Sequence, residues 1–256
     1  MQLIIDQMRS TLHQLFPTRK LRFTIISLVL LAALISVSEL AVLKLFTTII
    51  HSEGTYSRNQ LIALVAFFFI FYGMTRSGQF FQRIYRLRVF DKAFKHSDEE
   101  LTYAKDNWRW SLAIELSNIL SIFAQITVVA SFFIYFNWIF GLIDLAVVLI
   151  VLTIFGHFFG KQLDAQRGFV VAKKAKAPVA NSIRVGTRVK MGEQGILISG
   201  IAMIFLLAAL LYFSYNGEIS TSNAVVLFLG LRMQNTSLSG VSMGLMRFAR
   251  ARTHSE

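Results

Sequence analysis

Blocks of roughly twenty apolar residues recur six times along the chain. A helix needs about 20 apolar residues to cross a hydrocarbon core that is roughly 30 Å thick. Hydrophobic residues make up 55% of the 256 positions and charged residues only 16%, more apolar surface than a soluble fold of this size can bury. The two prolines, Pro17 and Pro178, lie outside the blocks, as unbroken spanning helices require. The sequence therefore predicts an all-α, multi-pass membrane protein.

Six spans are predicted in a single transmembrane domain that covers residues 1–256. The spans run over residues 23–50, 61–82, 112–136, 139–160, 195–215 and 223–246. The first block follows three basic residues, but it is too long for the apolar region of a secretory signal. Tight turns are expected at Asn137-Trp138 and at Tyr215-Asn216-Gly217.

The N-terminal residues 1–16 predict an amphipathic helix. Four apolar residues recur at helical spacing and share one face: Ile4, Met8, Leu12 and Leu15. We expect this helix to lie in the membrane interface before the chain enters the first span.

The basic residues predict the orientation of the chain. Of the 26 lysines and arginines, 22 lie in the N-terminal segment, in residues 83–111, in residues 161–190 or after the last span. Only Arg58 lies in a connection on the other side. Because cytoplasmic loops are enriched in Lys and Arg, both termini and these two segments are predicted to be cytoplasmic. The membrane that the chain crosses is predicted to be the inner membrane of the cell. The same rule accounts for the net charge of +12, so no nucleic-acid partner is expected.

Catalytic motifs are absent from the sequence. The chain has no cysteine, no G-x-x-x-x-G-K-[ST] phosphate loop and no HExxH, and its five histidines are scattered. No catalytic residue, metal site or cofactor can be assigned within the chain, and whether it takes part in an enzymatic reaction stays open.

A polar stripe marks the sixth predicted span. Five polar residues recur there at spacings of three and four: Arg232, Asn235, Thr236, Ser239 and Ser242. Such a stripe joins helices by hydrogen bonds in some bundles and lines a water-filled substrate pathway in others. We favour the pathway and add Glu39 and Arg76 to it, because these two residues also lie deep within spans.

Other ionisable residues in the spans have simpler interpretations. Lys44 and Glu115 lie close enough to span ends to extend toward the headgroups. The cations Lys44, Arg76 and Arg232 could attract an anionic lipid, lipid-linked sugar or peptide, although Glu39 and Asp144 could equally neutralise them inside the bundle. Two small-residue pairs, Gly156-x-x-x-Gly160 and Gly240-x-x-x-Gly244, indicate close helix packing.

The arrangement of the spans resembles the transmembrane domain of the ABC exporter family. It shares six spans, an interfacial N-terminal helix, and connections that are short on one side and long on the other. Four local stretches are also similar to that family: Ser36 to Leu40, Tyr85 to Phe90, Asn181 to Glu193 and Leu227 to Arg252. The resemblance implies an exporter-like bundle that pairs with a second copy or a homologous membrane half around a central cavity.

The resemblance also implies a motor. A fused exporter would continue beyond Glu256 into a nucleotide-binding domain, so the ATPase is a separate chain, has been removed or is absent. Where it is separate, ATP and Mg are expected on that partner subunit. The cytoplasmic segment 161–190 is shorter than is usual in the family. Residues 91–111 are therefore the better docking candidate for the ATPase, through Asp98, Glu99, Glu100, Lys105 and Asp106, with a solvated helix surface as the alternative.

Two functions follow as hypotheses. The first is the transmembrane subunit of an ABC exporter, which forms a substrate pathway and is driven by a separate ATPase. The second is a passive pore, immunity or anchoring protein of the membrane that works without an ATPase.

Overall fold

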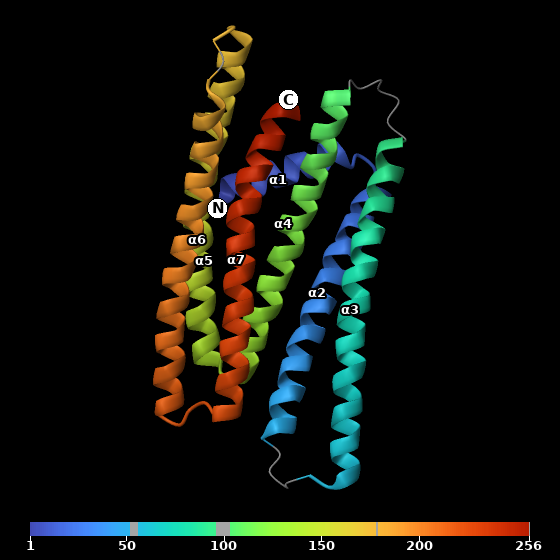
Figure 1. Ribbon diagram of the computed structural model, residues 1–256, viewed down its shortest axis with the longest axis vertical. Coiled ribbons are helices and arrows are strands. Elements are labelled where there is room, and N and C mark those ends of the chain that lie inside the picture. The colour runs from blue at the N-terminus through green and yellow to red at the C-terminus, as the bar shows by residue number, and fades with distance from the viewer. Residues whose placement is uncertain (52–55, 96–102, 178, 256) are drawn as a thin grey trace.

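The computed structural model describes residues 1–51, 56–95, 103–177 and 179–255. All the regular structure of these residues is helical (Figure 1). In chain order the helices are α1 Gln2–Leu15, α2 Arg19–Ile50, α3 Arg58–Lys95, α4 Tyr103–Phe136, α5 Trp138–Lys174, α6 Asn181–Tyr215 and α7 Thr221–Ser255. The predicted all-α architecture is confirmed.

Six long helices, α2 to α7, run in alternating directions along the same axis, and both termini lie toward one end (Figure 1). The predicted turns form where the sequence places them. Asn137 alone joins α4 to α5, and its side-chain Oδ1 accepts from the backbone N–H of Phe140 at 2.9 Å. Gly217 adopts φ +75° after α6, a backbone conformation that few residues other than glycine adopt readily.

Five of the helices, α2 to α6, are long and apolar enough to cross a membrane. The protein is therefore a multi-pass helical membrane protein by the length and composition of its helices. α7 is as long as its neighbours but carries the polar stripe, and it falls outside this set. α7 packs against α2, α4, α5 and α6, so much of its polar surface faces protein. The sixth span stays a prediction.

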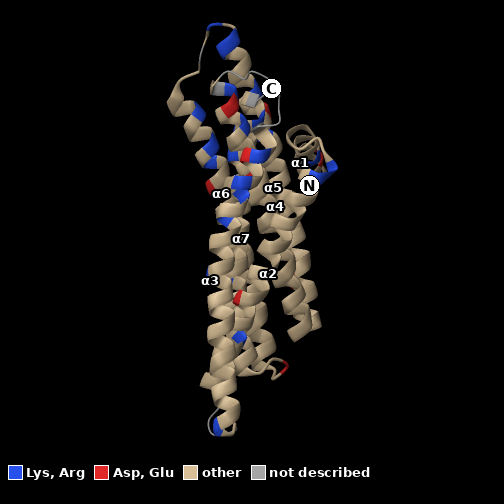
Figure 2. Cartoon of the chain, turned by 90° about the vertical axis from the view of Figure 1, so that its right-hand side faces the viewer, with Lys and Arg blue, Asp and Glu red and all other residues tan. Residues whose placement is uncertain are grey.

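Charged residues gather toward the end of the molecule that carries the C-terminus (Figure 2). The long helices continue into this end, so the predicted cytoplasmic segments are largely extensions of spanning helices. α3 runs on to Lys95, α5 runs on to Lys174, and α6 begins at Asn181. The α5–α6 hairpin projects farthest at this end (Figure 1).

The helix α1 lies across the bundle at the same end (Figure 1). Its buried residues are Ile4, Met8, Thr11 and Leu15, so the predicted apolar face is present, with Leu12 half-buried beside it. This face packs on α4 and α5. Gly156 admits the N-terminus closely, because a Cβ there would lie 2.6 Å from the backbone nitrogen of Met1. The first glycine pair is thus a docking point for α1.

Packing divides the long helices into two regions. The helices α4, α5, α6 and α7 pack against one another and form the four-helix group. The second glycine pair serves this group, since Gly240 and Gly244 of α7 lie against Ile122 and Ile119 of α4. α2 and α3 form the α2–α3 hairpin, in which α3 packs mainly on α2, and α2 alone makes extensive contact with α4 and α7.

Candidate functional site

The contact between α2 and helices α4 and α7 is here called the seam. Leu40 of α2 lies at its centre, 1% exposed, in one apolar cluster with Phe133 of α4 and with Leu227 and Leu231 of α7. Helical spacing places Glu39 and Leu43 on one flank of Leu40, and Ala41 and Lys44 on the other. A hollow lies on each flank.

The first hollow, the Arg232 hollow, has a volume of about 420 Å³. It is lined by Glu39, Leu43, Gln125, Leu229, Arg232, Met233, Thr236 and Ser237. The structure therefore brings together three of the predicted pathway residues, Glu39, Arg232 and Thr236. Among the residues that the structure describes, Arg232 forms no ion pair within 4 Å, and its side chain is exposed. The hollow presents one cation and one carboxyl on facing helices.

Glu39 of α2 is held in place by contacts between α2 and α3. Gln79 of α3 donates from Nε2 to Glu39 Oε1 at 2.8 Å. At the preceding residue of α2, Ser38 Oγ donates to the carbonyl of Phe71 and accepts from Thr75 Oγ1, both at 2.9 Å. These polar contacts fix the rotation of α2 against α3, and with it the direction of the Glu39 side chain.

Arg76 does not line the Arg232 hollow. Its guanidinium lies over the ring of Tyr72 on its own helix, 5.3 Å from the centroid, and its side chain is exposed. It remains close enough to Glu39 for electrostatic attraction. Of the predicted pathway, Arg76 is the residue that the structure places on the outer surface of α3.

The polar stripe of α7 divides between the hollow and the helix packing. Ser242 Oγ donates to the carbonyl of Gly192 at 2.9 Å, and Ser239 Oγ lies 3.2 Å from Ser199 Oγ on α6. Asn235 faces the same side, where its Oδ1 is buried without a hydrogen-bond partner among the described residues. Arg232 and Thr236 alone turn toward the hollow, because the stripe is wider than one helix contact. Part of the stripe thus joins helices by hydrogen bonds. For Arg232 and Thr236 the substrate pathway stays a prediction.

Asp144 forms a buried polar pair with Gln234, a residue that the sequence analysis missed. Asp144 of α5 is 0% exposed, and its Oδ1 accepts from Gln234 Nε2 at 2.8 Å. The other oxygen of each side chain has no partner among the described residues. Gln234 lies beside Asn235 in the sequence but off the predicted stripe. A carboxyl within a predicted span, as at Asp144, indicates that a polar partner lies on a neighbouring helix.

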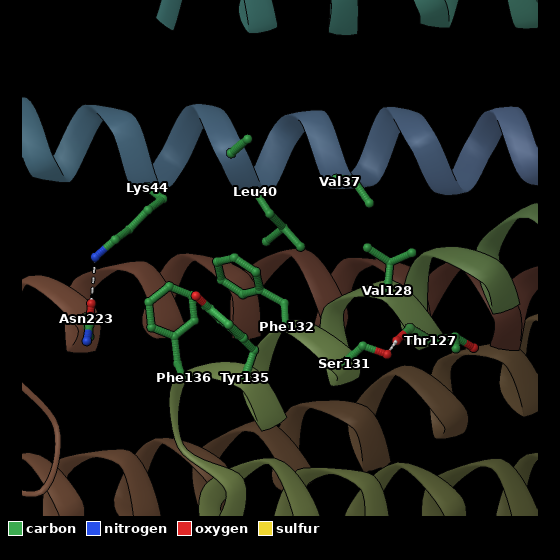
Figure 3. A pocket seen from close by; sticks show the side chains of 11 residues that line it. Val37, Leu40, Lys44, Thr127, Val128, Ser131, Phe132, Tyr135, Phe136 and Asn223 are labelled. Atoms are coloured by element: carbon green, nitrogen blue, oxygen red, sulfur yellow. Dashed lines mark hydrogen bonds between the residues drawn. The ribbon is translucent and has the colours of Figure 1, made fainter. Parts of the chain in front are cut away.

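The second hollow, the Lys44 hollow, is larger, with a volume of about 940 Å³ (Figure 3). It is lined by Val37, Leu40, Ala41, Lys44, Thr127, Val128, Ser131, Phe132, Tyr135, Phe136 and Asn223. Lys44 Nζ donates to Asn223 Oδ1 at 2.7 Å and lies 5.1 Å from the centroid of the Phe136 ring. The position of Lys44 near a span end predicts a side chain that reaches toward the headgroups, but no pattern within α2 predicts the hollow. The aromatic residues of α4 near position 135 were the available signal.

The basic end holds a cluster on the four-helix group. The ring of His254 stacks on Trp108 with centroids 4.5 Å apart, and Arg250 lies over the same indole at 5.2 Å. Burial, together with the positive charges of Arg184, Arg250 and Lys173, lowers the pKa of His254. Nearby, Glu115 pairs with Arg247 at 2.7 Å, so its carboxyl is neutralised locally.

The predicted ATPase-docking residues are only partly described. Asp98, Glu99 and Glu100 lie outside the described residues. Lys105 is exposed, and Asp106 is half-buried in the first turn of α4, where a carboxylate is favoured by the helix dipole. Asp106 thus has a structural reason for its position.

Metal binding finds no support in the part of the chain that the structure describes, where no group of three His, Asp or Glu side chains is close enough to hold an ion. Comparison with protein-family models and with curated proteins found no match for this chain.

Proposed function

We propose that the chain is the membrane subunit of an exporter of the ABC type, and that substrate crosses along the seam. The observation that carries this proposal is the Arg232 hollow. An arginine within a predicted span is costly unless it faces protein, water or a ligand, and here it faces a hollow with a carboxyl on the opposite wall. A site with both charges suits a substrate that carries polar or ionic groups.

The arrangement of the helices supports the same proposal. Six long antiparallel helices with both ends of the chain toward one pole are what an exporter half requires (Figure 1). We place that pole in the cytoplasm, at the inner membrane, because the basic residues gather there (Figure 2). The projecting α5–α6 hairpin and the start of α4 are then the surfaces that reach a separate ATPase.

A second membrane half completes the proposal. In the most apolar stretch of α3 only 6% of the residues are buried. This surface faces lipid, a second copy of the chain or a homologous half. Closing two halves around their seams would enclose the Arg232 hollow, and ATP binding on the partner would then drive a rigid-body change of access.

The test is purification of the full chain together with its ATPase. A stable complex with vanadate-sensitive ATP hydrolysis is expected. Arg232→Leu should preserve the complex and abolish the stimulation of hydrolysis by substrate. Arg58→Leu removes an equal charge at the start of α3, away from the hollow, and should leave stimulation unchanged.

Two results contradict the proposal. One is failure to associate with any ATPase under conditions in which the chain keeps its helical content. The other is leakage of ions from reconstituted vesicles without ATP, if that leakage depends on Arg232. The second result would favour the passive pore.

A further inference from the structure

The Lys44 hollow combines a single cation with an apolar trough. Lys44 forms no ion pair among the described residues, and its ammonium contacts only the Asn223 amide and the Phe136 ring (Figure 3). An ammonium has three donors, and these contacts use one of them in full. The cation thus retains the capacity to bind an anion.

Most of the rest of the hollow is apolar. Val37, Val128 and Phe132 face it, and the hydroxyls of Thr127 and Ser131 are already used within α4 (Figure 3). The third hydroxyl of the lining belongs to Tyr135, which is 84% exposed. Thr127 Oγ1 donates to the carbonyl of Phe123 at 3.0 Å, and Ser131 Oγ donates to that of Thr127 at 2.9 Å. This part of the hollow therefore offers contact to hydrocarbon and little to a polar molecule.

Polarity changes along the helix axis. Lys44, Asn223 and Phe136 lie at one end, and Val37, Val128 and Thr127 at the other (Figure 3). From Lys44 to the end of α2 at Ile50 is about 9 Å, and from Lys44 to Val37 is about 10 Å in the opposite direction. The charged end therefore lies near the membrane surface and the apolar end points toward the bilayer centre. A membrane lipid has the same order of head and tail.

The hollow is also open to lipid. Tyr135 is 84% exposed and Val37 is 50% exposed, so the wall between α2 and α4 is incomplete on the side that faces the bilayer. The volume of about 940 Å³ is at the upper end of the roughly 300–1,000 Å³ typical of small-molecule sites.

We propose that the Lys44 hollow is a binding site for an anionic phospholipid, whose phosphate contacts Lys44 and Asn223 and whose acyl chain lies along Val37, Val128 and Phe132. Charge complementarity selects an anionic head, and the axial order of polar and apolar lining selects a lipid over a soluble anion. The site depends on the chain being embedded in a bilayer and is independent of an ATPase.

The test measures bound lipid on the purified full chain by native mass spectrometry, with phosphatidylglycerol and phosphatidylcholine of identical acyl chains. Phosphatidylglycerol should bind more tightly. Lys44→Gln should weaken its binding about tenfold or more, since it removes the charge from the hydrogen bond to the phosphate. Lys44→Arg should retain it. Arg58→Gln, with the same loss of charge at the same end of the hairpin, should bind like the unaltered chain.

Val37→Trp tests the tail. It fills the apolar end without a change of charge and should weaken phosphatidylglycerol binding while circular dichroism shows unchanged helix content. Two outcomes overturn the proposal. One is equal lipid binding by the unaltered chain and Lys44→Gln. The other is displacement of the lipid by inorganic phosphate together with unchanged binding by Val37→Trp, which would assign the hollow to a free anion.

Discussion

The four-helix group and the α2–α3 hairpin differ in how much apolar helix surface they bury inside the protein. In the most apolar stretch of α5, 44% of the residues are buried inside the protein, against 6% in α3. Within the group the buried share falls to 33% in α4 and 22% in α6, whereas the hairpin leaves nearly all of this stretch of α3 to lipid or to another subunit. Both hollows lie where these two regions meet. Ligand-sized space thus arises at the edge of the four-helix group, where the hairpin joins it.

Glycine substitutions should separate the two regions most strongly. A Cβ at Gly141, at the start of α5, would lie 2.4 Å from the backbone nitrogen of Ile134, whereas one at Gly73 of α3 would meet nothing within 4 Å. Gly141→Ala is expected to lower the free energy of unfolding by about 1–3 kcal/mol, as overpacking does. Gly73→Ala should raise it by about 0.5–1 kcal/mol through helix propensity. Denaturant titration in micelles would measure both changes. Equal losses in the free energy of unfolding would contradict the contrast between the two regions.

Two amide–carboxyl pairs give the next largest contrast. Gln234 and Gln79 each donate to a carboxyl at 2.8 Å, but Asp144 is fully buried whereas Glu39 is half-buried beside a hollow. Gln234→Met should lower the free energy of unfolding by about 1–3 kcal/mol, because it leaves Asp144 without a donor. Gln79→Met should lower it by less than about 1 kcal/mol, since water can reach Glu39. A larger loss for Gln79→Met would contradict the contrast between a fully buried pair in the four-helix group and a half-buried pair in the hairpin.

The smallest effect is a pH dependence that belongs to the four-helix group. His254 contacts or faces Trp108 of α4, Lys173 of α5, Arg184 of α6 and Arg250 of α7. Its pKa is lowered in the folded state, so as pH falls below about 6.5 the unfolded chain binds a proton that the folded chain does not. Stability should fall over that range and be unaffected above it. His254→Asn should remove this part of the slope in thermal unfolding measured between pH 7.5 and 5.5.

Much of the fold follows from the sequence, because the patterns that specify it are local. Apolar block length predicts the long helices, Asn137 and Gly217 mark tight turns, and the spacing of Ile4, Met8 and Leu15 predicts the buried face of α1. These depend on helix geometry and on capping within a few residues. The sixth span stays open for the same reason, since the polar stripe of α7 lowers its hydropathy whether or not it crosses the membrane.

The candidate sites were less predictable, because they depend on which helices become neighbours. Sequence spacing grouped Arg232 with Asn235 and Ser242, but packing turned the last two toward α5 and α6. No pattern within one helix indicates that Gln234 meets Asp144, or that Lys44 meets Asn223, 179 positions away. An unpaired charge in a span predicts that some partner exists without saying which.

The most direct test of the account follows the hairpin against the four-helix group. The chain has no cysteine, so spin labels at Phe69→Cys on α3 and Ile204→Cys on α6 attach at only these two positions of the chain, and mixing with unlabelled chain leaves the distance within one copy. Both positions are exposed and lie outside the two hollows. In vesicles with the co-purified ATPase, the account predicts that ATP and vanadate shift the distance distribution, and that Arg58→Leu leaves the shift intact. A single distance that is unchanged by nucleotide would contradict it.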